Sequence, residues 1–182
     1  MQNEKNELGK KELLSRVLKA FFSLTFLKDT LYTFSFHLLN RTYGIIKTNK
    51  GKNVKIRPNV LLRDPERIYL GDNTTLGTGN ILWAGKESAV IKIGKNVMTG
   101  PSVKIFAFNH GVEISQTPMI EQATTEKDVI IGDNVWIGAN VLIMPGCNIE
   151  DGVVIGAGSV VTKNLPKNSI CAGIPAKVIK KR

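Results

Sequence analysis

Two histidines are the side chains of this chain best suited to proton transfer near neutral pH. His110 lies in the run Phe106-Ala-Phe-Asn-His-Gly, where an otherwise regular pattern of apolar residues stops. A positioned imidazole can take a proton from an attacking hydroxyl or amine, which typically adds about 10²- to 10⁴-fold to a rate. His37 lies in a hydrophobic N-terminal segment and is interpreted as a packing residue. His110 is therefore the candidate general base, and a hydrogen bond that orders its loop is the alternative role.

Metal and thiol chemistry are not expected. A zinc site built from three histidines needs one more histidine than the chain has, so no metal is predicted. Cys147 falls at an inward position of the repeat described below, and neither it nor Cys171 belongs to a Cys-x-x-Cys motif. Both cysteines are interpreted as small buried residues. The sequence also lacks a signal peptide with a cleavage site, so a reducing cytoplasm is the expected location.

A six-residue repeat must position His110. A large aliphatic side chain recurs at every sixth position from 131 to 161, and an apolar or small residue follows four positions later. The first series is Ile131, Ile137, Ile143, Ile149, Ile155 and Val161, and the second is Val135, Val141, Cys147, Val153, Ser159 and Leu165. Helices repeat every 3.6 residues and strands every two, so this period indicates one short strand followed by a turn.

Such a repeat predicts an all-β solenoid whose aliphatic side chains point inward. If three repeats close one coil, equivalent positions recur every 18 residues, so Ile137 should lie next to Ile155. Ile131 should likewise lie next to Ile149, with neighbouring strands about 4.8 Å apart. Glycine, asparagine and aspartate between the apolar positions allow the positive φ angles of tight bends.

The repeat continues toward the N-terminus with two interruptions. Residues Trp83–Ala89 form a small excursion, and Phe106–Asp128 lacks the pattern and is expected to be a long external loop. Long loops on a rigid scaffold are often functional, and His110 lies at the root of this one. The expected organisation is a helical segment at 1–50, a solenoid at 51–170 with an external loop at 106–130, and a basic tail at 171–182.

The N-terminal segment differs in kind from the repeat. Leu13–Asn40 is rich in leucine and phenylalanine and has no glycine or proline, which predicts one or two helices with a break near Asp29-Thr30. Charged residues interrupt it too often for a membrane span of about 20 apolar residues. Its apolar face either packs on the solenoid or a neighbouring subunit, or lies at a membrane surface. The membrane alternative rests on the basic residues beside the aromatic ones, Lys5, Lys10, Lys11, Arg16 and Lys19.

The charge of the whole chain favours an anionic partner. There are 25 Lys and Arg residues against 15 Asp and Glu residues, a net charge of +10. This excess does not identify the partner. Nucleic acid is not expected, because no recognised nucleic-acid module is present and the aromatic residues are not interleaved with the basic ones.

Three phrases, together with the repeat, resemble the hexapeptide-repeat acyltransferases, and most closely the maltose, galactoside and capsular-polysaccharide O-acetyltransferases. They are Ile131-Gly-Asp-Asn-Val-Trp-Ile-Gly-Ala139, Ile155-Gly-Ala-Gly-Ser-Val-Val-Thr-Lys163 and Ala172-Gly-Ile-Pro-Ala-Lys177. The resemblance covers about residues 54–182. It implies a left-handed parallel β-helix and a homotrimer that binds acetyl-CoA and an acceptor between adjacent solenoids.

The resemblance also implies roles for individual residues. His110 matches the catalytic histidine, and Glu113 is the nearest acidic residue that could orient it. Asn80 and Trp83 match or neighbour acceptor-binding positions, with a turn and a packing role as their respective alternatives. The residues implied on the CoA side are Ala139 and Ala157 along the pantetheine arm, and Thr162, Lys163, Lys177 and Lys180 near the adenosine end.

The expected function is CoA-dependent acetyl transfer to a saccharide hydroxyl, for example of a surface-polysaccharide precursor. Two alternatives remain open at this stage. An amino-sugar N-acetyltransferase would use the same base and the same cofactor groove, and a scaffold without catalysis would share only the fold. The expected location is the cytoplasm, with the inner face of the membrane as an alternative if the N-terminal segment binds lipid.

Overall fold

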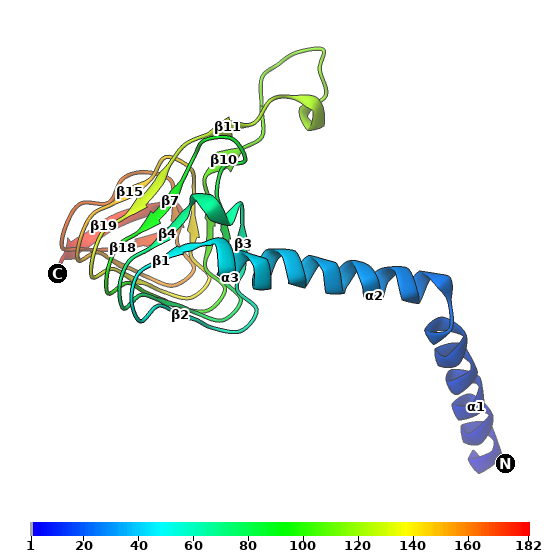
Figure 1. Ribbon diagram of the computed structural model, residues 1–182. Coiled ribbons are helices and arrows are strands. Elements are labelled where there is room, and N and C mark those ends of the chain that lie inside the picture. The colour runs from blue at the N-terminus through cyan, green and yellow to red at the C-terminus, as the bar shows by residue number, and fades with distance from the viewer. Residues whose placement is uncertain (1) are drawn as a thin grey trace. The chain divides into compact units, whose positions relative to one another are not determined.

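The computed structural model describes residues 2–182, and their side chains from Gly9 onward. The chain divides into two compact units, Met1–Leu39 and Asn40–Arg182. The first unit is helical, and the second is a parallel β-solenoid with one projecting loop (Figure 1). The expected combination of an N-terminal helical segment with an all-β solenoid is confirmed.

The helical unit contains α1 (Gln2–Phe21) and α2 (Leu24–His37). The predicted break near Asp29-Thr30 is wrong, because the chain bends at Phe22-Ser23. The Ser23 hydroxyl accepts a hydrogen bond from the Phe26 backbone N–H at 3.0 Å and caps α2. Serine is a favoured N-cap residue because it satisfies one of the free N–H groups of the first helical turn. Asp29 and Thr30 lie inside α2.

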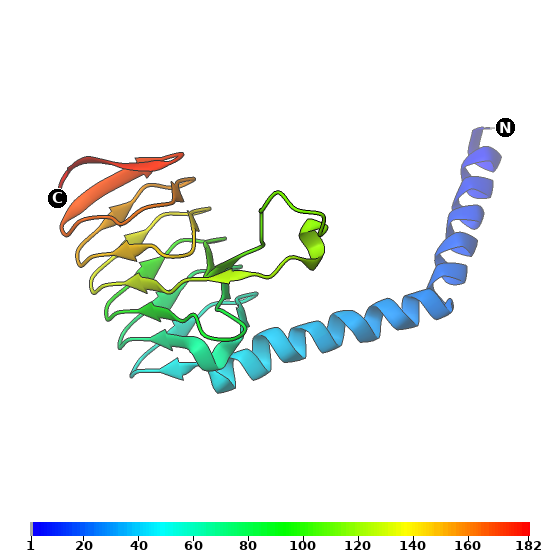
Figure 2. The same cartoon turned by 90° about the horizontal axis from the view of Figure 1, so that it is seen from above.

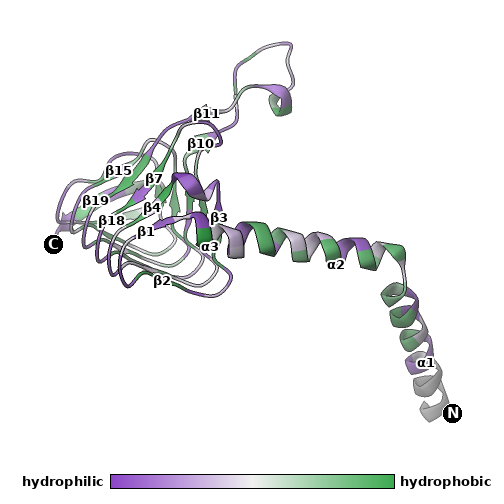
Figure 3. Cartoon of the chain, viewed as in Figure 1, coloured by the Kyte–Doolittle hydropathy of each residue, from purple (hydrophilic) through white to green (hydrophobic). Residues whose placement is uncertain are grey.

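Apolar residues recur along both helices (Figure 3). Many of their large side chains are exposed. Four of them, spaced three or four residues apart, mark one face of α1: Leu14, Val17, Leu18 and Phe21. No described helix is long and apolar enough to cross a membrane.

The π-helical turn η1 (Leu38–Tyr43) spans the boundary between the two units in the sequence. The second unit continues with the short helix α3 (Gly44–Lys47) and then winds into stacked coils (Figure 2). Each coil places one strand in each of three parallel sheets. Sheet A contains β1 (Asn49–Lys50), β4 (Ile68–Leu70), β7 (Ile91–Ile93), β12 (Val129–Ile131) and β15 (Asn148–Ile149). Sheet C contains β3 (Leu61–Arg63), β6 (Ile81–Trp83), β9 (Lys104–Phe106), β14 (Leu142–Ile143) and β17 (Val160–Val161). Sheet B contains β2 (Lys55–Ile56), β5 (Thr75–Leu76), β8 (Met98–Thr99), β13 (Trp136–Ile137), β16 (Val154–Ile155), β18 (Ser169–Gly173) and β19 (Ala176–Lys181).

The strand register confirms the coil length expected for the uninterrupted part of the repeat. Ile137 pairs with Ile155, and Ile131 pairs with Ile149. The inward residues of every coil form one core, in which Ile137 and Ile143 are fully buried. Cys147 also lies in this core, where burial raises the pKa of its thiol.

The corners between strands use two devices. Asparagines take the left-handed conformation there, among them Asn134 with φ 55° and Asn140 with φ 56°. Aspartates join successive coils, because the Asp151 carboxylate accepts the Asp133 backbone N–H at 2.9 Å. This bond, with help from Lys167, lowers the pKa of Asp151.

Two segments depart from the parallel coils. The external loop leaves after β9, and its base is an antiparallel pair of β10 (Phe108–Asn109) and β11 (Thr125–Glu126). Residues expected to be a basic tail form instead the antiparallel hairpin of β18 and β19, in which Lys177 pairs with Ala172 and Lys180 with Ile170. Two single 3-10 turns complete the fold, η2 (Pro65–Arg67) and η3 (Met119–Glu121).

Candidate active site

His110 lies directly after β10, at the start of the external loop, and its side chain is exposed. Its ring contacts the ring of Phe108 edge-on, with 6.3 Å between the centroids. Within residues 9–182, no side chain or backbone group hydrogen-bonds the imidazole. Both ring nitrogens are therefore available to a bound molecule.

The base of the loop is held in place by a carboxylate. Glu126 on β11 accepts hydrogen bonds from the backbone N–H groups of Glu87, Ser88 and Ala89 at 2.7 to 3.0 Å. The Ser88 hydroxyl adds a fourth bond at 3.1 Å. These donors, with those of Ala89 and Glu87 first, lower the pKa of Glu126 to about 2. Glu126 thus ties the excursion after β6 to the loop that carries His110.

A cavity of about 400 Å³ opens beside His110. Its lining comes from the end of β3, the end of β6, the excursion and both strands of the loop base, namely Arg63, Asp64, Trp83, Lys86, Phe108, His110, Thr124 and Glu126. The register of sheet C explains why these residues meet. Arg63 pairs with Trp83 and Trp83 pairs with Phe106, so all three end their strands at the same corner.

Trp83 is fixed on three sides. Its indole N–H donates to the Asp64 carboxylate at 3.0 Å, and the Arg63 guanidinium lies 3.5 Å from the centre of its ring. The Phe108 ring meets it edge-on at 4.9 Å. Asp64 adopts a left-handed backbone conformation with φ 52°, which is uncommon for a residue other than glycine. The partly exposed Trp83 ring lines the cavity together with the guanidinium stacked on it.

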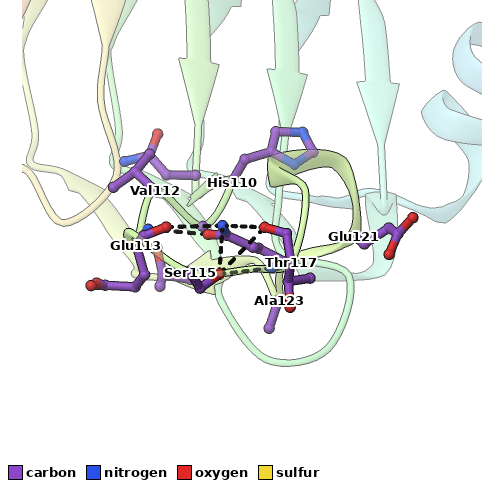
Figure 4. Close-up of a pocket in the computed structure, with 11 residues that line it drawn as sticks. His110, Val112, Glu113, Ser115, Thr117, Glu121 and Ala123 are labelled. Carbon is purple, nitrogen blue, oxygen red and sulfur yellow. Dashed lines mark hydrogen bonds between the residues drawn. The ribbon is translucent and has the colours of Figure 1, made fainter.

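A second hollow, of about 880 Å³, lies within the external loop. Gln122 organises this loop, because its amide nitrogen donates to the carbonyls of Glu113 and Thr117 at 3.0 Å each. Its amide oxygen accepts the Glu113 backbone N–H at 3.1 Å. Figure 4 shows these bonds converging inside the loop, with the Glu113 carboxylate directed away from His110. Glu113 therefore does not orient the imidazole in this structure.

Asn80 lies in the interior rather than in the cavity. Its side chain is fully buried, its amide nitrogen donates to the Gly100 carbonyl at 2.8 Å, and its amide oxygen accepts the Thr99 hydroxyl. Both functional groups of the amide are thus used between neighbouring coils. This placement gives Asn80 a structural role instead of the acceptor contact that the sequence suggested.

The residues expected on the CoA side fall into two groups. Ala139 and Ala157 occupy the corner between sheets B and C in adjacent coils, where the Gly158 N–H donates to the Ala139 carbonyl at 2.8 Å. In the next coil, Ala172 packs against Gly156 and pairs with Lys177 of β19. Lys180, also exposed, lies further along β19. Thr162 and Lys163 are exposed after β17, at the corner between sheets C and A, where the external loop also emerges.

Comparison with known proteins gives this arrangement a family. Residues 128–163 match the model described as bacterial transferase hexapeptide (six repeats). WbbJ of Escherichia coli K12, named as a lipopolysaccharide biosynthesis O-acetyl transferase, is 41% identical over 146 residues, which cover 66% of this chain and 74% of WbbJ. The chain belongs to the hexapeptide-repeat transferase family. The solenoid is accordingly a left-handed β-helix.

Solved members of the hexapeptide-repeat family share this fold. A maltose O-acetyltransferase from Clostridium difficile 630 is 37% identical with a TM-score of 0.62, covering 74% of this chain and 69% of that one. A galactoside acetyltransferase solved in complex with coenzyme A is 30% identical with a TM-score of 0.57, covering 70% and 64%. Against further curated acetyltransferases from two yeasts and Escherichia coli, this chain spans only 45% to 62% of their length.

Sequence reasoning missed several residues that line the cavity of this hexapeptide-repeat protein. Arg63 and Asp64 end the first coil, whose pattern is the least regular, although Arg63 lies 20 positions before Trp83 and pairs with it. Lys86 lies in the excursion, and Thr124 and Glu126 come from the far end of the loop. Only the position of Arg63 had a signal in the repeat, because the other residues lie outside it.

Proposed function

We propose that the protein transfers the acetyl group of acetyl-CoA to a hydroxyl of a saccharide, with His110 as the general base. The observation that carries the proposal is the exposed His110 ring, free of hydrogen bonds to the described residues, on a cavity that the fixed ring of Trp83 also lines. The sugar acetyltransferases named among the relatives support the acceptor class.

The chemistry needs one base and one electrophile. His110 takes the proton of the acceptor hydroxyl while its oxygen bonds to the carbonyl carbon of the thioester. When the tetrahedral intermediate collapses, the C–S bond breaks and the proton passes from His110 to the departing thiolate. The acetyl ester and free CoA are the products, so the charges balance without a metal ion.

The acetyl donor would lie along the small residues of the corner between sheets B and C. Ala139 and Ala157 leave room there for the pantetheine arm, and the exposed Lys177 and Lys180 suit its phosphates. Thr162 and Lys163 lie at the corner between sheets C and A, so they would contact a donor bound along the corner of a neighbouring copy. Because Ala139 and His110 lie at different corners of one solenoid, a second copy would bring its own corner to the donor. A homotrimer satisfies this requirement for every copy.

Replacing His110 tests the base. In His110→Ala we expect kcat/KM for acetyl transfer to fall by about 10²- to 10⁴-fold. Thiol release from acetyl-CoA would be followed with matched methyl glycosides and amino sugars, which separates hydroxyl from amine acceptors. Calorimetry should give unchanged acetyl-CoA binding. His37→Ala is the control and should keep full activity. Equal activity in both variants would remove His110 from the mechanism.

Replacing two lysines tests the donor groove. In the double variant Lys163→Ala, Lys177→Ala we expect about 10-fold weaker acetyl-CoA binding by calorimetry, since each lysine contributes a charge-assisted contact to a phosphate. The matched control is Lys52→Ala, Lys95→Ala, which removes two exposed charges at the corner between sheets A and B, outside the proposed groove. A folded wild-type protein that binds no acetyl-CoA would contradict the enzyme proposal and favour a scaffold.

The N-terminal helices would bind an anionic membrane surface, and the enzyme would then lie at the inner face of the membrane. The exposed apolar face of α1 supports this, together with the charges in its described part, Lys10, Lys11, Arg16 and Lys19 against the single Glu12. The side chain of Lys5 lies outside the described residues. Basic and apolar side chains on one helix are typical of helices that lie in the lipid interface.

A further inference from the structure

The cavity beside His110 is lined by two cations, Arg63 and Lys86, that form no ion pair with the described residues. Arg63 is half-buried and Lys86 is exposed, and both line the cavity. Among residues 9–182, neither side chain makes an ion pair or a hydrogen bond. Nearby Arg67 differs, because its guanidinium donates to the Glu87 carbonyl at 2.7 Å. The fold thus uses Arg67 for structure and leaves the donors of Arg63 unused.

The pose of Arg63 is set in advance. Its guanidinium stacks 3.5 Å from the centre of the Trp83 ring, and Trp83 is itself held by Asp64. A stacked guanidinium keeps its planar fork of N–H donors free at its edges, and that fork matches the two oxygens of a carboxylate or the oxygens of a phosphate. Less side-chain freedom is then lost when an anion binds.

The carboxylates that face this cavity are already engaged. Glu126 accepts four hydrogen bonds from residues 87–89, and one oxygen of Asp64 accepts the Trp83 indole N–H. Neither carboxylate approaches Arg63 or Lys86 within ion-pair distance. Glu126 is therefore committed to backbone donors and one Asp64 oxygen to Trp83, while the N–H donors of Arg63 and Lys86 are open to a ligand.

We propose that this cavity binds an anionic group of the acceptor, a carboxylate or phosphate carried by the saccharide, through Arg63 and Lys86. A neighbouring hydroxyl of the same saccharide would then face His110. This inference rests on the proposed acetyl transfer for its biological meaning. Binding of the acceptor can nevertheless be measured without any transfer.

The test follows the fluorescence of Trp83 in a Trp136→Phe background, because the chain has only these two tryptophans. Methyl glucuronide, glucose 1-phosphate and neutral methyl glucoside are titrated at about 0.15 M salt. We expect one or both anionic probes to bind about 10-fold or more tightly than the neutral one. Comparing the two anionic probes distinguishes a carboxylate from a phosphate.

Variants assign the preference to the cations. In Arg63→Gln we expect the anionic probes to fall to the affinity of the neutral probe, and in Lys86→Gln to weaken by about 3- to 10-fold. Lys86 lies in an exposed loop, so its variant stays informative if Arg63→Gln folds poorly. Lys95→Gln removes an exposed charge outside the cavity and should leave all three affinities unchanged.

Two results would overturn the inference. One is equal affinity of the wild-type background for anionic and neutral probes. The other is an equal loss of affinity for both kinds of probe in Arg63→Gln, which would mean that Arg63 only supports Trp83. Acetyl transfer is assayed separately on the same samples. Anion-selective binding without transfer would contradict the proposed function while this inference stands.

Discussion

At the scale of single residues, two amide side chains, those of Asn80 and Gln122, have separate structural tasks. Asn80 is fully buried and joins neighbouring coils, whereas Gln122 holds the external loop through its hydrogen bonds to residues 113 and 117. A buried amide of this kind is costly to remove, because its partners lose their hydrogen bonds but cannot reach water. Residue type alone does not distinguish these roles from acceptor binding.

Replacing Asn80 should therefore destabilise the fold without a direct effect on acetyl transfer. Asn80→Ala removes the donor to the Gly100 carbonyl and the acceptor of the Thr99 hydroxyl, which keeps its bond from the Gly77 N–H, at a cost of about 2–4 kcal/mol in the free energy of unfolding by urea. Asn148→Ala, at an exposed position, should change it by less than about 0.5 kcal/mol. If Asn80→Ala leaves the stability unchanged but raises KM for the acceptor, Asn80 contacts the acceptor after all.

At the scale of elements, the external loop and the excursion after β6 behave as one structure because Glu126 joins them. The pKa of this carboxylate is lowered to about 2, which means that folding stabilises its ionised form relative to its protonated form. The stabilisation is complete above the ordinary carboxyl pKa of 4.5 and is lost as the pH falls from there toward 2.

Glu126→Ala should loosen this junction in a pH-dependent way. At pH 7 we expect the free energy of unfolding to fall by about 1–2 kcal/mol. This is less than the full effect of the pKa shift, because the carboxylate is partly solvated. We also expect faster hydrogen exchange at the backbone amides of residues 87–89. The stability difference from wild type should shrink between about pH 4.5 and pH 2. The control is Glu121→Ala on η3. A stability difference that is constant with pH would contradict the role given to the charge.

How much of this could be predicted from sequence follows from how each element is stabilised. The coils were predictable because each inward side chain, such as Ile137, packs on its equivalent one coil away. Each coil has three such inward strands, so an apolar residue recurs every six residues in the sequence. The hydrogen bonds between Glu126 and residues 87–89 could not be predicted, because they join residues 37 to 39 positions apart and use backbone donors that any residue type has. Arg63 was missed because its importance depends on stacking against Trp83, which only the register reveals.

At the scale of the whole molecule, the two units suit different tasks. The solenoid buries its apolar residues in one continuous core, whereas the described part of the helical unit leaves most of its large apolar side chains exposed. So many exposed large apolar residues indicate a surface that a membrane or another protein covers. Because basic side chains lie beside the apolar ones on α1, we propose that an anionic membrane covers this surface.

Vesicle binding tests this proposal on the full-length protein. We expect it to sediment with vesicles containing anionic lipid and to bind neutral vesicles far more weakly. Lys10→Gln, Lys11→Gln, Lys19→Gln should weaken binding to anionic vesicles by about 100-fold, at about 1 kcal/mol for each lysine at the surface. Phe21→Ser should weaken it by removing buried apolar area, whereas Lys52→Gln, Lys55→Gln, Lys95→Gln on the solenoid is the matched control. If Phe21→Ser leaves vesicle binding intact but dissociates the oligomer, the apolar face contacts a neighbouring subunit instead of lipid.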